Sequence, residues 1–214
     1  MSNVLIVAEH ADGALKKATL SAVTFGREAA QRTGGEVQGL VLGQGTSAVA
    51  EEMAKYVSTV HHVDDATFAN PLAETVAKAV KQAAEAASAT VVVMSATAHG
   101  KDALPRAAAL MNAGLASDVV GFAKDQGFAV KRPIQAGNII ATCEVTTDVK
   151  LFSPRPTEFD PAEPARSPGS VSSLSVDAGD LKTRFVKFEG VQSDRPPLAD
   201  APVVVSGGRG LKEP

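Results

Sequence analysis

The clearest candidate for ligand chemistry lies near the carboxyl terminus, where Arg209 stands among Gly207, Gly208 and Gly210. The preceding run, Pro202 to Ser206, is apolar and β-branched, which predicts a buried strand. A glycine-rich turn after a strand lets backbone N–H groups approach a phosphate, and a guanidinium beside it suits a pyrophosphate. The alternative is that Arg209 is a tail residue that binds no ligand.

Two pairs of polar side chains could bind an anion or a partner protein. Lys101 and Arg106 follow the apolar run Val91 to Ser95, where open α/β sheets place their ligand loops. Arg132 and Asn138 flank a glycine and could fix a loop at a subunit interface through hydrogen bonds. Purely structural roles are the alternative for both pairs.

The other reactive residues favour structural roles. His61 and His62 are neighbours on an expected strand, so their imidazoles point to opposite faces and cannot hold one metal ion. Asp118 is expected to be a turn or capping residue rather than an acid catalyst. Cys143 is the only cysteine, and without a basic neighbour it is expected to be an inert buried thiol. No Ser-His-Asp, paired-carboxylate or Cys-His arrangement indicates a hydrolase.

Composition narrows the class of protein. With 44% apolar residues, 21% charged residues and a net charge of -3, the chain is typical of a soluble globular protein and offers no basic field for nucleic acid. The amino terminus passes directly into the apolar run Val4 to Ala8, which leaves no room for an export signal. No apolar run approaches the ~20 residues that span a bilayer, so we expect no membrane insertion.

Short apolar runs alternate with helical patterns over the first half of the chain. We expect strands at 4–8, 37–42, 57–63 and 91–95, and helices at 14–32, 47–56 and 72–87. This alternation predicts parallel βαβ units and therefore an α/β fold with a mostly parallel sheet between helical layers.

The pattern changes after Gly100. A short helix is expected at 105–111, and residues 118–152 indicate antiparallel strands added at the sheet edge. Five prolines between Pro154 and Pro168 indicate a boundary or a surface loop. Leu181 to Phe188 alternates like a half-exposed strand. The strand and glycine turn after residue 202 have no following helix to cover them, so we expect the severed start of a second domain.

Four segments resemble the α subunit of electron-transfer flavoprotein, in the order found in that family. Gly100 to Ala109 resembles its GKD-x-x-PR-x-A segment, and Arg132 to Ala141 resembles its RPIYAGNAIA segment with Gln135 in place of tyrosine. Arg155 to Ala162 corresponds to its RPTAF segment, and Val203 to Leu211 resembles its SGGRGL signature. The resemblance covers essentially the whole chain.

The resemblance implies a Rossmann-like or adenine-nucleotide-hydrolase-like α/β domain at residues 1–192. A linker at 193–201 and the truncated start of a C-terminal FAD-binding domain at 202–214 would follow. The family holds FAD through segments SRAAVDAG, VGQTG, GAIQH and INKD, and none of them occurs here. Only Arg209, with its flanking glycines, carries over as an FAD contact. We therefore expect this chain to lack FAD and to be colourless.

The resemblance also implies the function of an electron carrier rather than an enzyme. The α subunit would pair with a β subunit that holds AMP, with Lys101, Arg106, Arg132 and Asn138 as interface candidates. The heterodimer would take electrons from acyl-CoA dehydrogenases and related dehydrogenases, as in fatty acid β-oxidation, and pass them to a quinone oxidoreductase. The expected location is the bacterial cytoplasm, or the mitochondrial matrix for a processed eukaryotic protein.

Two other hypotheses assign the chain to different functional classes, a nucleotide-binding module and a scaffold without redox chemistry. A stand-alone nucleotide-binding module of the universal-stress type would need a glycine loop for phosphate after the fourth strand. Ser95 to Gly100 offers one glycine only, although His10 and His99 each follow a strand at the edge where a nucleotide would lie. A scaffold that binds the β subunit without redox chemistry is the third hypothesis.

Overall fold

The computed structural model describes residues 2–124, 127–190, 198, 201 and 203–212. The chain divides into two compact units, residues 1–184 and residues 185–214. Every strand and α-helix of the described residues lies in the first unit. None of the helices in the described part of the chain is long and apolar enough to cross a membrane.

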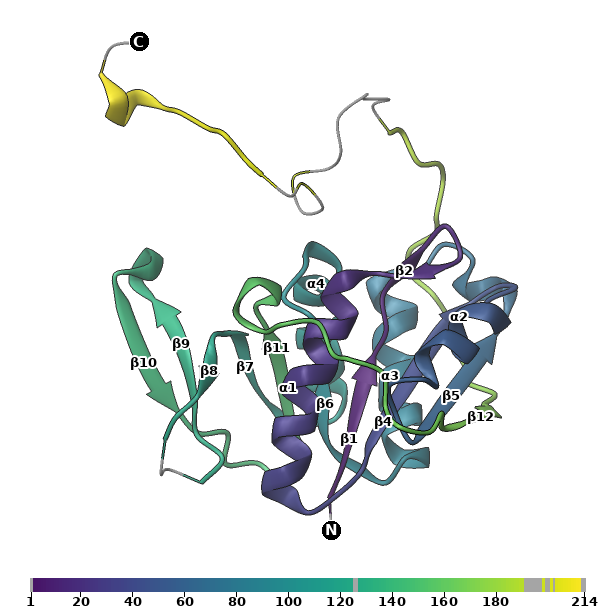
Figure 1. The fold of residues 1–214 in the computed structure, drawn as a ribbon. Coiled ribbons are helices and arrows are strands. Elements are labelled where there is room, and N and C mark those ends of the chain that lie inside the picture. The colour runs from purple at the N-terminus through teal and green to yellow at the C-terminus, as the bar shows by residue number, and fades with distance from the viewer. Residues whose placement is uncertain (1, 125–126, 191–197, 199–200, 202, 213–214) are drawn as a thin grey trace. The chain divides into compact units, whose positions relative to one another are not determined.

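A parallel sheet forms the centre of the first unit (Figure 1). Its strands are β1 (Asn3–Val7), β4 (Val37–Gly43), β5 (Thr59–Asp64), β6 (Ala89–Val93), β7 (Gly114–Val119), β11 (Lys150–Pro154) and β12 (Ser170–Ser173). They are ordered β12-β5-β4-β1-β6-β11-β7, and each neighbouring pair is parallel. The mostly parallel sheet expected from the sequence is therefore confirmed.

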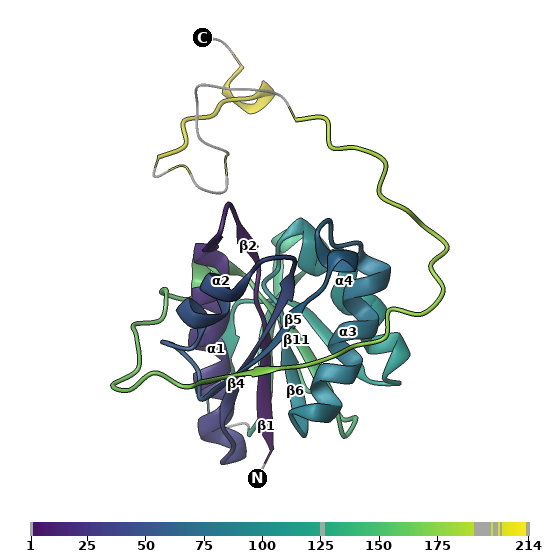
Figure 2. The same cartoon turned by 90° about the vertical axis from the view of Figure 1, so that its right-hand side faces the viewer.

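Helices cover both faces of this sheet. They are α1 (Lys17–Thr33), α2 (Ser47–Met53), α3 (Ala73–Ala86) and α4 (Ala98–Leu110), and the short 3₁₀ turn η1 (Ala66–Phe68) precedes α3. Figure 2 shows α1 and α2 on one face and α3 and α4 on the other. The two helical layers and the sheet give the three-layer α/β fold that the alternation of elements predicted.

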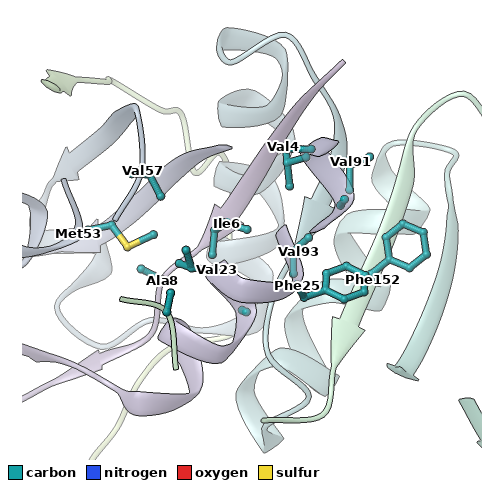
Figure 3. Close-up of a cluster of buried hydrophobic side chains, with 14 of the residues drawn as sticks. Val4, Ile6, Ala8, Val23, Phe25, Met53, Val57, Val91, Val93 and Phe152 are labelled. Carbon is teal, nitrogen blue, oxygen red and sulfur yellow. The ribbon is translucent and has the colours of Figure 1, made fainter. Parts of the chain in front are cut away.

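The alternation of side chains along β1 explains why the strand is apolar throughout. Val4 and Ile6 pack into the core on the side of α1 and α2, which Figure 3 shows. Leu5 and Val7 pack into the core on the side of α3 and α4. Successive strand residues point to opposite faces, so a strand covered on both sides needs apolar residues at every position.

A second, antiparallel sheet follows β7 in the sequence. It contains β8 (Gly121–Phe122), β9 (Val130–Ile134) and β10 (Ile139–Cys143), with the 3₁₀ turn η2 (Gln135–Gly137) between the last two. A small pair, β2 (His10–Ala11) and β3 (Ala14–Leu15), lies before α1. The expectation of added antiparallel strands is confirmed for residues 121–143 but is wrong for β11, which inserts between β6 and β7 in parallel.

The segment of residues 155–183, here called the belt, runs from the face of α1 to the face of α3 past the edge of β5 (Figure 2). It includes the 3₁₀ turn η3 (Pro156–Glu158), and Thr24 and Arg27 of α1 donate to carbonyls of Asp160 and Glu163. Further along, β12 pairs with β5. The proline-rich part is thus a surface loop, as the prolines predicted.

Two predicted strands are absent, and one predicted helix begins earlier than expected. The expected strand at Leu181 to Phe188 is exposed backbone without regular structure, because no neighbouring strand pairs with it there. The expected strand at 202–206 is absent over residues 203–206, whose side chains are exposed, and Pro202 lies outside the described residues. The helix expected from residue 105 begins at Ala98, because Thr97 caps its amino end.

Candidate functional site: a cationic cluster at the ends of β7 and β11

Segments that are far apart in the sequence meet at the carboxyl ends of β7 and β11. These strands pair in parallel, so Asp118 and Arg155 leave the sheet at the same edge. A backbone hydrogen bond of 2.9 Å between the residue after β7 and β9 brings Arg132 to the same place. The positive charges of Arg132 and of Lys101 on α4 also act on Asp118. We call Asp118, Arg155, Arg132 and Lys101 the cationic cluster.

Asp118 and Arg155 form a bidentate ion pair. The guanidinium donates from Nε to Oδ1 at 3.1 Å and from Nη2 to Oδ2 at 2.7 Å. Asp118 has a φ of 57°, and the register of β7 against β11 shifts between Ser153 and Pro154. The positive φ and the register shift mark a β-bulge, which re-aims the carboxylate out of the sheet. The prediction of a turn or capping role for Asp118 is therefore wrong.

The electrostatics of the cluster exclude a role for Asp118 as a proton donor. The hydrogen bonds from Arg155 hold the pKa of Asp118 below its ordinary value, and the charges on Lys101 and Arg132 act in the same direction. Burial opposes this shift but does not reverse it. A carboxylate with a lowered pKa stays ionised near neutral pH, so it cannot act as a general acid there.

The neighbours of Arg132 accept only some of the hydrogen bonds that its guanidinium can donate. Its Nη2 donates to the hydroxyl oxygen of Ser117 at 3.1 Å, whereas its Nε is buried and has no hydrogen-bond partner among the residues that the structure describes. The hydroxyl oxygen of Ser153 accepts the backbone N–H of Asp118 at 3.1 Å. Arg132 therefore retains donor capacity beside two serine hydroxyls that the sequence analysis did not single out.

The position of Lys101 depends on the close approach of α4 to β6. Gly100 lies against the end of the strand, where a Cβ would overlap the carbonyl oxygen of Ser95. Lys101 is the residue after Gly100 and so lies close to the sheet. Arg106 is five residues further along and about 140° around the helix from Lys101, at 3.6 residues per turn. The structure therefore brings Lys101 into the cluster and leaves Arg106 exposed outside it.

Asn138 lies at the tip of the β9–β10 hairpin rather than in the cluster. Its side-chain amide donates to the carbonyl of Gln135 at 3.0 Å, which closes a turn in which Gln135, Ala136 and Gly137 all have positive φ. On the strands beside this tip, Ile134, Ile139 and Ile140 are 37%, 45% and 54% exposed. Grouped apolar side chains at a hairpin tip are typical of a surface that a partner covers.

The fold and the motifs agree with one family. The model of the electron transfer flavoprotein domain matches residues 4–178, which is most of the chain. The chain belongs to the electron transfer flavoprotein domain family. The identification made from the GKDALPR, RPIQAGN, RPTEF and SGGRGL segments is thus confirmed. Lys101, Arg132 and Arg155, from the first three of these segments, are the cations of the cluster.

Relatives in this family include named α subunits. The electron transfer flavoprotein subunit alpha of Pseudomonas aeruginosa is 40% identical over 211 residues, covering 98% of this chain and 66% of the relative. A probable mitochondrial subunit alpha of Caenorhabditis elegans is 36% identical, covering 99% and 63%. The mitochondrial electron transfer flavoprotein subunit alpha of Oryza sativa subsp. indica is 37% identical, covering 98% of this chain and 61% of the relative. The chain spans less than two thirds of the length of these relatives.

The family name implies a bound flavin, so the question is whether the segment around Arg209 has the surroundings that a flavin needs. Arg209 begins the 3₁₀ turn η4 (Arg209–Leu211) after the extended residue Gly208. All described side chains from Val203 to Lys212 are exposed, including Val205 at 94%. One guanidinium and three glycines suit an anionic group, but an exposed segment provides no wall for a flavin ring. The described residues of this segment do not by themselves form an FAD site.

A separate pocket of about 330 Å³ lies at the carboxyl ends of β1 and β4. His10 and His99, expected at this edge, both line it, and His10 donates from Nε2 to the carbonyl of Leu42 at 2.8 Å. Glu9 is 5% exposed and accepts the hydroxyl of Thr97, the capping residue of α4, at 2.6 Å. A buried carboxylate at this helix terminus occupies the position that favours an anion.

His61 and His62 have different partners. His61 contacts the side-chain oxygen of Gln38 at 2.7 Å, and His62 contacts Thr46 at 3.0 Å. Cys143 is only half-buried, because the side chains of β10 are exposed or partly exposed, so the prediction that this thiol is buried is wrong. Of the interface candidates of the first unit, Lys101 and Arg132 converge, whereas Arg106 and Asn138 do not join them.

Proposed function

We propose that the chain is an α-type subunit of electron-transfer flavoprotein, an FAD-containing carrier that pairs with a β subunit. The observation that carries this proposal is the similarity to named α subunits over 98–99% of the chain. The carrier would take electrons from acyl-CoA dehydrogenases and related dehydrogenases and deliver them to a quinone oxidoreductase. The bacterial cytoplasm or the mitochondrial matrix is the proposed location, and AMP is proposed in the β subunit.

We propose that the first unit supplies the surface for the β subunit. The hairpin tip exposes three isoleucines, and the partly exposed Arg132 lies on the same hairpin, so apolar and cationic contacts are available side by side. Residues 202–214 are proposed as the start of the flavin-binding domain, with Arg209 as one contact among others that this segment does not contain. FAD, when bound, supplies the redox chemistry.

The test is to co-express the chain with a β subunit and to measure how much β subunit is retained. We expect Ile140→Asp to weaken retention about tenfold, which corresponds to about 1.4 kcal/mol, because it places a charge in the apolar contact. Leu110→Asp is the matched control, since Leu110 is 44% exposed but lies at the end of α4. Equal retention by both variants would contradict the proposed surface.

The expected absence of FAD is tested by flavin absorption of the purified 214-residue chain. We expect no bound flavin, because Arg209 and its glycines form no enclosed surface. Stoichiometric FAD on the chain alone would show that the proposed division at residue 202 is wrong.

A nucleotide-binding module is the second candidate function, and the pocket at β1 and β4 is the observation that favours it. Its volume of about 330 Å³ is within the range of small-ligand sites. Glu9, however, lies at the amino end of α4, where a phosphate would have to bind. Titration with ATP and AMP decides between the candidates, and micromolar binding that Glu9→Gln strengthens would favour the module.

A further inference from the structure

A pocket of about 200 Å³ opens beside the cationic cluster. It is lined by Gly100, Lys101, Leu104, Pro105, Leu115, Ser117 and Ser153. At ~30 Å³ for each water, this volume holds about seven waters. It is below the ~300 Å³ at which sites for cofactor-sized ligands begin, so it suits a single side chain or a similarly small group.

The polar end of the pocket consists of groups that can donate protons. The oxygen of Ser117 already accepts from Arg132, and the oxygen of Ser153 already accepts from the N–H of Asp118. Each hydroxyl therefore keeps its own proton for another acceptor, and a hydroxyl that accepts from a charged donor is itself a stronger donor. Lys101 adds an ammonium group. Ser153 is only 2% exposed, so this donor set is largely preformed.

Acidic groups do not compete for these donors. Among the residues that the structure describes, no aspartate or glutamate lines the pocket. Asp118 is nearby, but both of its carboxylate oxygens accept from Arg155. The pocket therefore carries net positive charge, and an anionic group would complete its hydrogen bonds.

The remaining walls distinguish a carboxylate from a phosphate. Leu104, Pro105 and Leu115 are apolar, so one side of the pocket favours methylene groups. A phosphate has no apolar portion to place there, whereas a carboxylate on a short aliphatic stem satisfies both ends. The adjacent hairpin, whose base residue Arg132 contacts Ser117, exposes isoleucines that a protein partner would cover.

We propose that this pocket receives the side chain of a glutamate presented by a partner protein. Its carboxylate binds Lys101, Ser117 and Ser153, and its methylene groups pack against Leu104 and Leu115. This inference goes beyond the proposed electron-carrier function, because it requires no flavin and names the group that the surface recognises.

The test is an NMR titration of the full 214-residue chain with blocked amino acids. N-acetyl-glutamate N-methylamide should shift the amide signals around Lys101, Ser117 and Ser153 and should saturate. The isosteric glutamine derivative, which lacks the charge, should bind at least about tenfold more weakly, equivalent to 1.4 kcal/mol. Lys101→Met should weaken glutamate binding at least about fivefold. Lys81→Met is the matched control, because Lys81 lies on α3 and should leave binding unchanged.

Several results would overturn the inference. Equal binding of the glutamate and glutamine derivatives would show that charge is not recognised, and tighter binding of inorganic phosphate would assign another anion. If butyrate bound more tightly than blocked glutamate, the ligand of the pocket would be a free small acid rather than the side chain of a partner protein. No saturable shift at this pocket, or full binding by the Lys101→Met chain, would also remove the proposal. Lys101 is exposed, so this variant is expected to fold even if Ser153→Ala does not.

Discussion

The parallel sheet and the belt of residues 155–183 are held in place by different kinds of contact. In the sheet, residues Val4 to Val7 of β1 are almost completely buried between two helical layers. In the belt, most side chains from residue 163 to residue 173 are exposed, and the backbone is bound by a side chain of α1 and by the pairing of β12 with β5. The comparison separates burial, which stabilises the whole unit, from hydrogen bonds that fix one segment locally.

The contacts of the belt with α3 show this local control. Glu74, Lys78 and Gln82 are spaced four residues apart and so share one face of the helix. Lys78 donates to the carbonyls of Ala178 and Asp180 at 2.6 and 2.9 Å. Gln82 exchanges two hydrogen bonds with the backbone of Asp177, and Glu74 accepts the hydroxyl of Thr183 at 2.9 Å. One helix face thus positions the last residues of the first unit.

The largest effect is expected in the core. Phe152 is fully buried in β11 and lies 5.6 Å from Phe25, centroid to centroid. Phe152→Ala should destabilise the chain by about 3–5 kcal/mol, because it leaves a cavity on the α1 side of the sheet. Urea unfolding measures the change. A loss below about 1 kcal/mol would mean that burial in the sheet does not dominate stability.

The ion pair between β7 and the start of the belt should have an intermediate effect. Asp118→Asn should cost about 1 kcal/mol at pH 7, since the pair is partly exposed. The folded pKa of Asp118 is lowered, so its stabilisation is present above the unfolded pKa of about 3.9 and is lost as pH falls through the folded value. The difference in unfolding free energy between wild type and variant should therefore shrink below about pH 4. A pH-independent difference would contradict the ion-pair assignment.

The smallest global effect is expected in the belt. Replacing Lys78 and Gln82 together by alanine should change the free energy of unfolding by less than about 1 kcal/mol, because both side chains form hydrogen bonds near the surface. Hydrogen exchange should nevertheless accelerate at residues 174–184, while exchange in β1 stays unchanged. Lys81→Ala on the same helix serves as control. Faster exchange throughout the sheet would show that the belt is not a local unit.

Sequence patterns predicted the sheet better than they predicted its borders. The apolar runs of β1, β4, β5 and β6 identified these strands, because burial on both faces requires apolar residues. The strand β12 has the sequence SVSS, which carries no such signal, and it exists because its backbone pairs with β5. Leu181 to Phe188 alternates like a strand but has no strand beside it. Alternation alone is therefore insufficient where no partner edge is available.

The cationic cluster was predictable in part. The motif segments contained Lys101, Arg132 and Arg155, but the spacing of Lys101 and Arg106 suggested a pair that the helix geometry separates. Ser117 and Ser153 carried no signal, since serine is common at surfaces. Their role depends on the bulge at Asp118, which arises from a register shift between two strands that are about 35 residues apart in the sequence.

By itself, the amino-acid sequence determined the α/β class, the order of the βαβ units and the family, because periodic burial and short motifs are local properties of the chain. Only the tertiary structure decided which cations meet. The parallel pairing of β7 with β11 and the close approach of α4 at Gly100 place Lys101, Arg132 and Arg155 around Asp118. Contacts of this kind depend on packing between distant segments, which no local pattern encodes.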